Sequence, residues 1–200
     1  MGAAWFVDGS YAYKCWREVC PERPLDFKRL REAIERDAGE PLRENYYFNA
    51  ESDPPSAKQD SFHKRIAIPA PEGAGLRLML YWTQTKDLYW PKALGGQAVI
   101  HPTMTDVRYR QKTHKGVDVG IGYHMARSFN QKDWDKLYLM AGDGDFAEVV
   151  HDLVKFGGVD VSVIGTRHTI SSELGPWTRP IYLEDHLDIL ALNVGGMNYA

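Results

Sequence analysis

The sequence has few cysteines, no long apolar run and no signal-like start. Cys15 and Cys20 are five residues apart in a predicted helix and lie off one another's face, which disfavours a disulfide. Free thiols suit a reducing cytosol. No apolar stretch approaches the roughly 20 residues of a membrane span, and the first residues lack a cationic signal region. We therefore expect a cytoplasmic protein with no membrane partner.

An excess of positive charge is also absent, because the net charge is -3. Any contact with nucleic acid must then use a local basic patch. None of the seven histidines pairs with another at zinc-ligand spacing. Repeats, low-complexity tracts and linkers are lacking, and 200 residues suit one domain. We expect a single domain over residues 1–194 and a C-terminal tail over residues 195–200, and the sequence leaves a homo-oligomer open.

Short apolar runs alternate with segments of helical periodicity. Strands are expected at residues 3–7, 44–50, 76–83, 107–112, from 137, and at 159–164. Helices are expected at 11–19, 26–37, 56–68, from 117, from 146, at 171–174 as a short helix or turn, and at 184–192. Residues 85–101 lack clear periodicity, which indicates an irregular loop or a hairpin insertion. The alternation predicts an α/β fold with a mainly parallel sheet and helices on both faces.

Two carboxylates, Asp143 and Asp145, follow an apolar strand and precede a helix. In an open α/β sheet such a turn lies at the carboxyl edge, where ligands bind. Two acids so close repel each other unless a positive group such as a metal ion lies between them. The alternative interpretation makes Asp145 a helix cap and Asp143 a solvated turn residue.

Asp8 and Asp118 extend this acidic pattern. Asp8 ends the first predicted strand, and Asp118 begins a helix between apolar neighbours. If the four aspartates converge, their oxygens suit Mg²⁺ or Mn²⁺, which activates water and stabilises the leaving oxygen of a phosphodiester. The structural alternatives are that Asp8 precedes a cap at Ser10 and that Asp118 complements a helix dipole.

A basic run, residues 108–115, precedes Asp118. It contains Arg110, Lys112 and Lys115, which are candidates for binding RNA phosphates, and Tyr109, which is a candidate for stacking on a base. The alternative is a solvated edge strand with protective charge.

Four segments together resemble one family. They are Asp8-Gly-Ser10, Lys115-Gly-Val-Asp118-Val, Ala141-Gly-Asp143-Gly-Asp145-Phe and Val159-Asp-Val-Ser-Val-Ile-Gly165. In this order, from about Trp5 to about Leu190, they resemble the NYN domain family, PIN-like proteins of the LabA/DUF88 type. The resemblance implies a PIN-like three-layer sandwich with a central, mainly parallel sheet, and metal-dependent ribonuclease activity. Ser10 stands where the family usually has Asn.

The resemblance implies that Asp8, Asp118, Asp143 and Asp145 bind the metal. The leading hypothesis is an endoribonuclease in which Asp8 and Asp143 ligate Mg²⁺ or Mn²⁺ directly. Asp118 and Asp145 ligate it or orient water, and Ser10 holds water or a phosphate oxygen. The principal alternative is a non-catalytic RNA-binding or adaptor protein with the same fold.

Two further classes fit less well. A von Willebrand A-like adhesion site reads Asp-x-Ser-x-Ser, but Ala12 replaces the second serine. A glycosyltransferase Asp-x-Asp site would use Asp143 and Asp145, but nothing else indicates a sugar nucleotide.

Overall fold

The computed structural model describes residues 2–51, 54–101, 103–114, 116–131 and 133–192. For residues 84–85, 105–106 and 111–114 it describes the backbone only. The expected tail at 195–200 lies outside these residues. None of the helices in the described ranges is long and apolar enough to cross a membrane.

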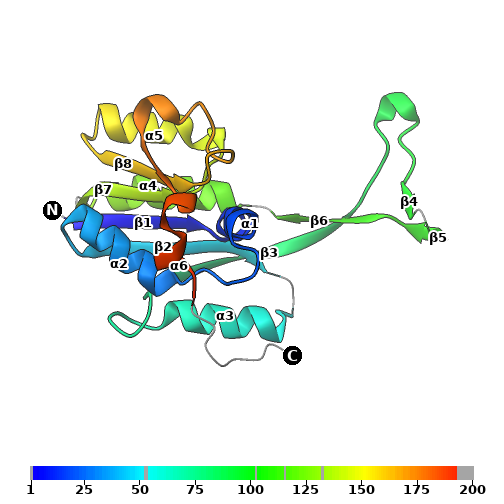
Figure 1. The fold of residues 1–200 in the computed structure, drawn as a ribbon. Helices are drawn as coiled ribbons and strands as arrows, with labels where there is room; N and C mark the ends of the chain where they lie inside the picture. The colour runs from blue at the N-terminus through cyan, green and yellow to red at the C-terminus, as the bar shows by residue number, and fades with distance from the viewer. Residues whose placement is uncertain (1, 52–53, 102, 115, 132, 193–200) are drawn as a thin grey trace.

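A seven-stranded sheet forms the centre of the fold, in the order β6-β3-β2-β1-β7-β8-β9 (Figure 1). Its strands are β1 (Gly2–Asp8), β2 (Leu42–Glu51), β3 (Arg77–Asp87), β6 (Arg110–His114), β7 (Trp134–Met140), β8 (Asp160–Gly165) and β9 (Arg179–Tyr182). Six of them are parallel, and β6 pairs antiparallel with β3 at one edge. The expected mainly parallel α/β sheet is confirmed.

Helices cover both faces of the sheet. The α-helices are α1 (Gly9–Val19), α2 (Phe27–Ala38), α3 (Ala57–Ala67), α4 (Val117–Phe129), α5 (Ala147–Lys155) and α6 (Leu187–Leu190). Helices α1, α2, α3 and α6 contribute to one core, and α4 and α5 contribute to the other. The molecule therefore has three layers.

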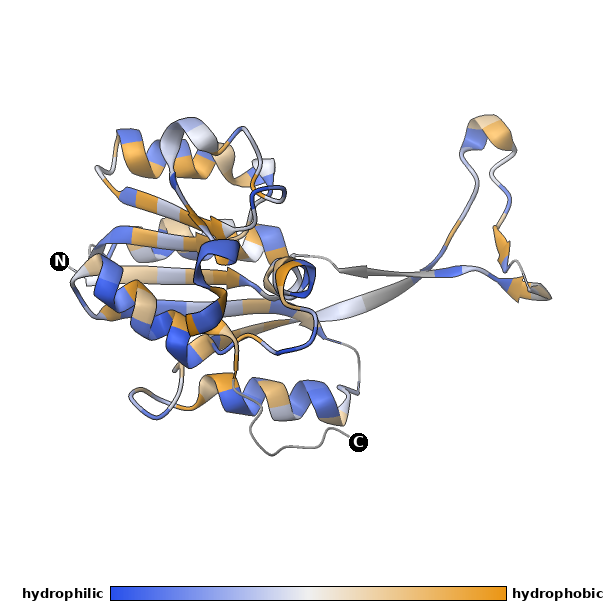
Figure 2. Ribbon diagram, in the orientation of Figure 1, coloured by the Kyte–Doolittle hydropathy of each residue, from blue (hydrophilic) through white to orange (hydrophobic). Residues whose placement is uncertain are grey.

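The central strand β1 explains this layering. Trp5 and Val7 lie in one core, whereas Ala4 and Phe6 lie in the other, because successive side chains of a strand point to opposite faces. All of them are fully buried. Strands buried on both faces are typical of parallel sheets, and Figure 2 shows the apolar residues concentrated in the strands.

Several boundaries differ from the sequence expectation. Strand β3 continues past Thr83 to Asp87, and the expected strand at 107–112 is divided between β5 (Met104–Arg108) and β6. Strand β9 was not among the expected strands; it contains Pro180, which a sheet tolerates here because β9 is an edge strand. The expected helix at 184–192 is the 3-10 helix η4 (Leu183–His186) followed by the single turn of α6. The expected turn near 171–174 precedes the 3-10 helix η3 (Gly175–Trp177).

Residues 83–114 form a long projection, called the arm (Figure 1). Its base is the β3–β6 ribbon, and its outer part contains η1 (Lys92–Leu94), β4 (Ile100–His101) and β5. Hydrogen bonds join Leu88 to Tyr109 and Val99, and β4 pairs antiparallel with β5. Of the two interpretations of residues 85–101, the hairpin insertion is confirmed. The rest of the chain is called the body.

Candidate active site

Asp8 connects β1 to α1. Its Oδ1 accepts the backbone N–H groups of Ser10 (2.8 Å) and Tyr11 (3.1 Å), so Asp8 itself caps α1. The interpretation of Ser10 as the cap is wrong, because a carboxylate one residue before the helix reaches both open donors. Among the described residues, both capping hydrogen bonds of Asp8 go to Oδ1. Capping therefore fixes the carboxylate and leaves Oδ2 for another partner.

Asp143 and Asp145 lie on the turn after β7. Asp143 caps the 3-10 helix η2 (Gly144–Phe146), and its Oδ1 accepts the N–H of Asp145 at 3.1 Å. Helix α5 begins at Ala147 with no side-chain cap. The assignment of Asp145 as the cap is thus wrong, and the capping residue is Asp143. The side chain of Asp145 is exposed.

Glycine at position 142 lets this turn approach α1 closely. A Cβ there would lie 2.3 Å from Tyr11 Oη and 2.4 Å from the carbonyl oxygen of Thr169. Both contacts are shorter than side chains tolerate. Tyr11 Oη in turn hydrogen-bonds Thr169 Oγ1 at 2.9 Å. The glycine thereby lets the turn after β7 pack closely against Tyr11 of α1 and the backbone at Thr169.

Asp118 lies in the first turn of α4. Gly116 precedes this helix with φ +89°, a conformation that glycine adopts without strain. No side chain caps the helix, so the negative charge of Asp118 is the local complement to the helix dipole. Lys115, the other candidate of this motif, lies outside the described residues.

The topology brings these positions to one edge. Strand β1 has β2 on one side and β7 on the other, so the chain order reverses at β1. Asp8 lies in register with Phe48 of β2, and Val7 lies in register with Met140 of β7. Asp8 and Asp143 therefore lie at the carboxyl ends of adjacent strands, where open α/β sheets bind ligands.

Charges of neighbouring aspartates raise the pKa of Asp8 and of Asp118. Burial raises the pKa of Asp8, the N–H groups of Tyr11 and Ser10 oppose this, and the charges of Asp118 and Asp143 raise the pKa further. Burial also raises the pKa of Asp118, as do the charges of Asp143 and Asp145. We call Asp8, Asp118, Asp143 and Asp145 the acidic cluster. Like charges this close favour an added cation or proton.

The donor chemistry of the acidic cluster suits a hard divalent cation. All four side chains offer carboxylate oxygens, which Mg²⁺ and Mn²⁺ prefer. Within the described chain, none of the four forms an ion pair with Lys or Arg, so no built-in cation neutralises them there. Among the described residues, no set of three or more His, Cys, Asp or Glu side chains is placed to hold a metal ion. The metal-binding roles of the four aspartates stay predictions.

Two polar residues beside the cluster were not expected. Asn49 of β2 accepts a long hydrogen bond (3.4 Å) from Ser10 Oγ. Glu173 lies against the turn, because a Cβ on Gly144 would be 2.3 Å from its Oε2. Asn49 is near a strand end, so the reasoning used for Asp8 would have found it. Glu173 lies in a turn-rich segment without such a signal.

Of the basic residues that are candidates for RNA binding, Arg110 and Lys112 lie on the arm, and Lys115 lies outside the described residues. Arg110 Nε donates to Asp87 Oδ1 at 3.2 Å, and Arg108 Nη1 donates to Asp87 Oδ2 at 3.2 Å. Arg110 begins β6, roughly 14 Å along the strand from His114 at about 3.4 Å per residue. Lys112 lies in β6, but its side chain is outside the described atoms. The described part of the basic run therefore lies at the end of β5 and in β6 of the arm, and it precedes α4 and Asp118 in the chain.

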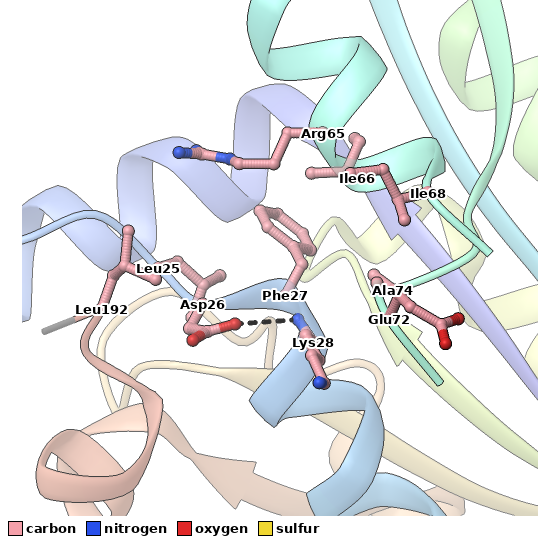
Figure 3. Close-up of a pocket in the computed structure, with 11 residues that line it drawn as sticks. Leu25, Asp26, Phe27, Lys28, Arg65, Ile66, Ile68, Glu72, Ala74 and Leu192 are labelled. Carbon is pink, nitrogen blue, oxygen red and sulfur yellow. Dashed lines mark hydrogen bonds between the residues drawn. The ribbon is translucent and has the colours of Figure 1, made fainter. Parts of the chain in front are cut away.

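A cavity of about 210 Å³ lies elsewhere, between the start of α2, the end of α3 and Leu192 (Figure 3). Its walls are mainly apolar, with Phe27 and Ile66 among the lining residues. None of the four aspartates lines it. The cavity is thus separate from the acidic cluster.

Comparison with known proteins assigns the family. The sequence model of the NYN domain matches residues 2–175. The chain belongs to the NYN domain family. NYN domains are generally nucleases of the PIN-like fold, and the PIN-like three-layer arrangement expected from the sequence is the one observed.

A solved structure agrees on the fold. The chain is similar to a protein of unknown function from Vibrio parahaemolyticus RIMD 2210633, with a TM-score of 0.59 and 18% identity. The match covers 94% of this chain and 96% of that chain. At this identity the similarity concerns the fold alone. No curated protein matches the sequence.

Proposed function

We propose that this NYN domain is a metal-dependent endoribonuclease that cleaves RNA phosphodiester bonds at the acidic cluster. The observation that carries the proposal is the placement of Asp8 and Asp143 at adjacent strand ends, at the reversal point of the sheet, where the charges of Asp118 and Asp143 raise the pKa of Asp8. Placing carboxylates where their charges raise the pKa of a neighbour costs stability, and a catalytic or binding role accounts for that cost. A divalent cation would offset that repulsion.

The residues divide into distinct roles. Asp8 and Asp143 would hold the metal, because capping already fixes one oxygen of each carboxylate. Asp118 and Asp145 would add a ligand or orient the attacking water. When bound, Mg²⁺ or Mn²⁺ supplies a water of lowered pKa and neutralises charge on the leaving oxygen.

Ser10 would hold a water or phosphate oxygen at the position where the family usually has Asn. Its shorter side chain reaches Asn49 Oδ1 at 3.4 Å, so β2 brings a carboxamide beside it. We include Asn49 in the proposed substrate-positioning group, because its amide can donate to the phosphate that Ser10 contacts. Arg110, Lys112 and Lys115 would bind the RNA backbone, and the first two lie on β6, the strand that precedes Asp118 in the chain.

The test is cleavage of single-stranded and structured RNA by the purified protein with Mg²⁺, with Mn²⁺ and with a chelator. Asp118→Asn should stop metal-dependent cleavage yet keep or strengthen RNA binding, because it removes a charge that repels phosphate. Asp152→Asn, an exposed aspartate on α5 outside the cluster, is the matched control and should cleave normally. A wild-type protein that binds RNA but cuts nothing with either metal would establish the adaptor function instead.

A further inference from the structure

The arm exposes a concentration of large apolar side chains. Seventeen large hydrophobic residues of the described chain are exposed, and eight of them are in the arm. They are Leu88, Tyr89, Trp90, Leu94, Ile100, Met104, Val107 and Tyr109. Their exposed fractions run from 36% to 68%. The arm projects away from the body in Figure 1, so the helices of its own chain do not cover these residues.

The exposed apolar surface of the arm is large enough for a protein interface. At about 200 Å² per large side chain, the exposed fractions amount to on the order of 800 Å². That total is about one partner's share of a standard interface. The arm therefore has the size and character of a contact surface.

Charge indicates what would cover it. Residues 86–114 contain five Lys or Arg and two Asp, a formal charge of +3, whereas the whole chain carries -3. The remaining residues thus carry -6. Two arms would repel each other, but an arm and the body of another copy would attract each other. A second copy of this chain accordingly offers a complementary surface.

We propose that the arm of one copy packs on the body of a second copy, and that the exchange is reciprocal in a two-fold dimer. Closed two-fold symmetry is the commonest arrangement of identical subunits and buries both arms at once. RNA is the other anionic candidate, but it would leave Leu94, Ile100, Met104 and Val107 without a use, since bases stack on aromatic rings. The mixed aliphatic and aromatic surface favours a protein.

The oligomeric state tests this proposal. Leu94→Gln/Met104→Gln, the arm variant, makes two exposed apolar arm side chains polar, and Gln97→Ser/Thr103→Ser, which exchanges two exposed polar arm side chains for another polar one, is the matched control. Sedimentation equilibrium from about 1 to 100 μM should show a dimer for the wild type and for the control variant. The arm variant should dissociate at least about tenfold more readily. Circular dichroism should show that both variants keep the wild-type fold.

A monomeric wild type throughout this range would overturn the proposal. A dimer that the arm variant leaves intact would overturn it as well. If the wild type is monomeric and the arm variant loses only RNA binding, the arm is an RNA clamp and the dimer proposal fails. Because none of these measurements depends on cleavage, failure of the nuclease proposal would be seen separately.

Lys92→Glu tests whether the arm meets a body or another arm. It lowers the formal charge of residues 86–114 from +3 to +1 at an exposed position. Contact with an acidic body should weaken, with a several-fold higher dissociation constant that converges on the wild-type value at high salt. Tighter dimerisation would mean relief of arm–arm repulsion and would refute the arm-on-body arrangement.

Discussion

The body and the arm use the same strand β3 in opposite ways. In the body, β3 is one of six parallel strands and lies between β2 and β6 in the sheet order. Past Thr83 it leaves the layers and pairs only with β6. Burial on two faces stabilises the body, whereas the arm is a thin ribbon with exposed side chains. Stability is therefore concentrated in the body, and the exposed side chains of the arm contribute little to it.

The largest expected difference concerns core and arm aromatics. Phe6 is fully buried and packs against Phe48, with ring centroids 6.0 Å apart. Phe6→Ala should lower the free energy of unfolding by about 3–5 kcal/mol. Trp90→Ala on the arm should change it by less than about 0.5 kcal/mol. Urea unfolding at sub-micromolar protein measures both, and a large loss for Trp90→Ala would contradict the division between body and arm.

Asp143→Asn should separate activity from stability within the body. If Asp143 ligates the metal, cleavage should fall by at least about 10²-fold, the upper range seen for residues that only support a ligand. Asn retains an oxygen for the N–H of Asp145 and removes one repelling charge. The apo variant should therefore melt at or slightly above the wild-type temperature. A large drop in apo melting temperature would assign Asp143 a structural role.

The basic strand should affect RNA binding without affecting the body. Replacing Arg110, Lys112 and Lys115 with Ala should weaken binding of single-stranded RNA, and each lost phosphate contact should flatten the salt slope by roughly 0.7. Binding at several salt concentrations gives the slope, and thermal melting supplies the folding control. An unchanged slope would show that RNA does not contact this strand.

The smallest expected effects depend on pH and have opposite signs at two aspartates. The raised pKa of Asp8 means that its contribution to stability is full below its ordinary pKa and is lost as pH rises through the folded value. Asp8→Asn keeps a capping oxygen but cannot ionise. Its melting temperature relative to wild type should therefore rise between about pH 4 and pH 7.

Asp37 is the matched control. Burial raises the pKa of the Asp37 carboxyl group, but hydrogen bonds from Arg179 and Tyr138 lower it, and the pKa lies below its ordinary value. Its contribution is present above the ordinary pKa and is lost as pH falls through the folded value. Asp37→Asn should accordingly melt below wild type at pH 7, and the deficit should shrink in acid. Melting curves of both variants from pH 3 to pH 8 provide the comparison, and parallel curves would contradict both assignments.

The body was largely predictable from sequence because its signals are local. The apolar runs at Ala3–Val7 and Leu137–Ala141 give β1 and β7, and carboxylates just beyond them follow from strand-end reasoning. Capping was assigned to the wrong residues at both turns. Sequence alone shows that Asp and Ser can cap, but the observed backbone decides which oxygen reaches the open N–H groups.

The arm and the last strand were less predictable because pairing there is distant or atypical. The pairing of Thr83 with His114 spans the whole insertion, and no periodicity in residues 85–101 marks it. Strand β9 is hard to predict because it contains Pro180, and a sheet tolerates proline mainly in an edge strand. The metal-binding role of the acidic cluster was expected both from the residue types and from the resemblance, and it stays a prediction. The strand order that places Asp8 and Asp143 at adjacent strand ends is encoded by no local pattern.

Pro180 also bears on how copies of the protein can associate. It lies in β9, the outermost strand on one side of the seven-stranded sheet, and it has no backbone N–H to donate. Proline on an edge strand disfavours the addition of a further strand on that side. The opposite edge strand, β6, contains no proline. Growth into fibres needs both edges of the sheet to accept a strand, so Pro180 disfavours such growth.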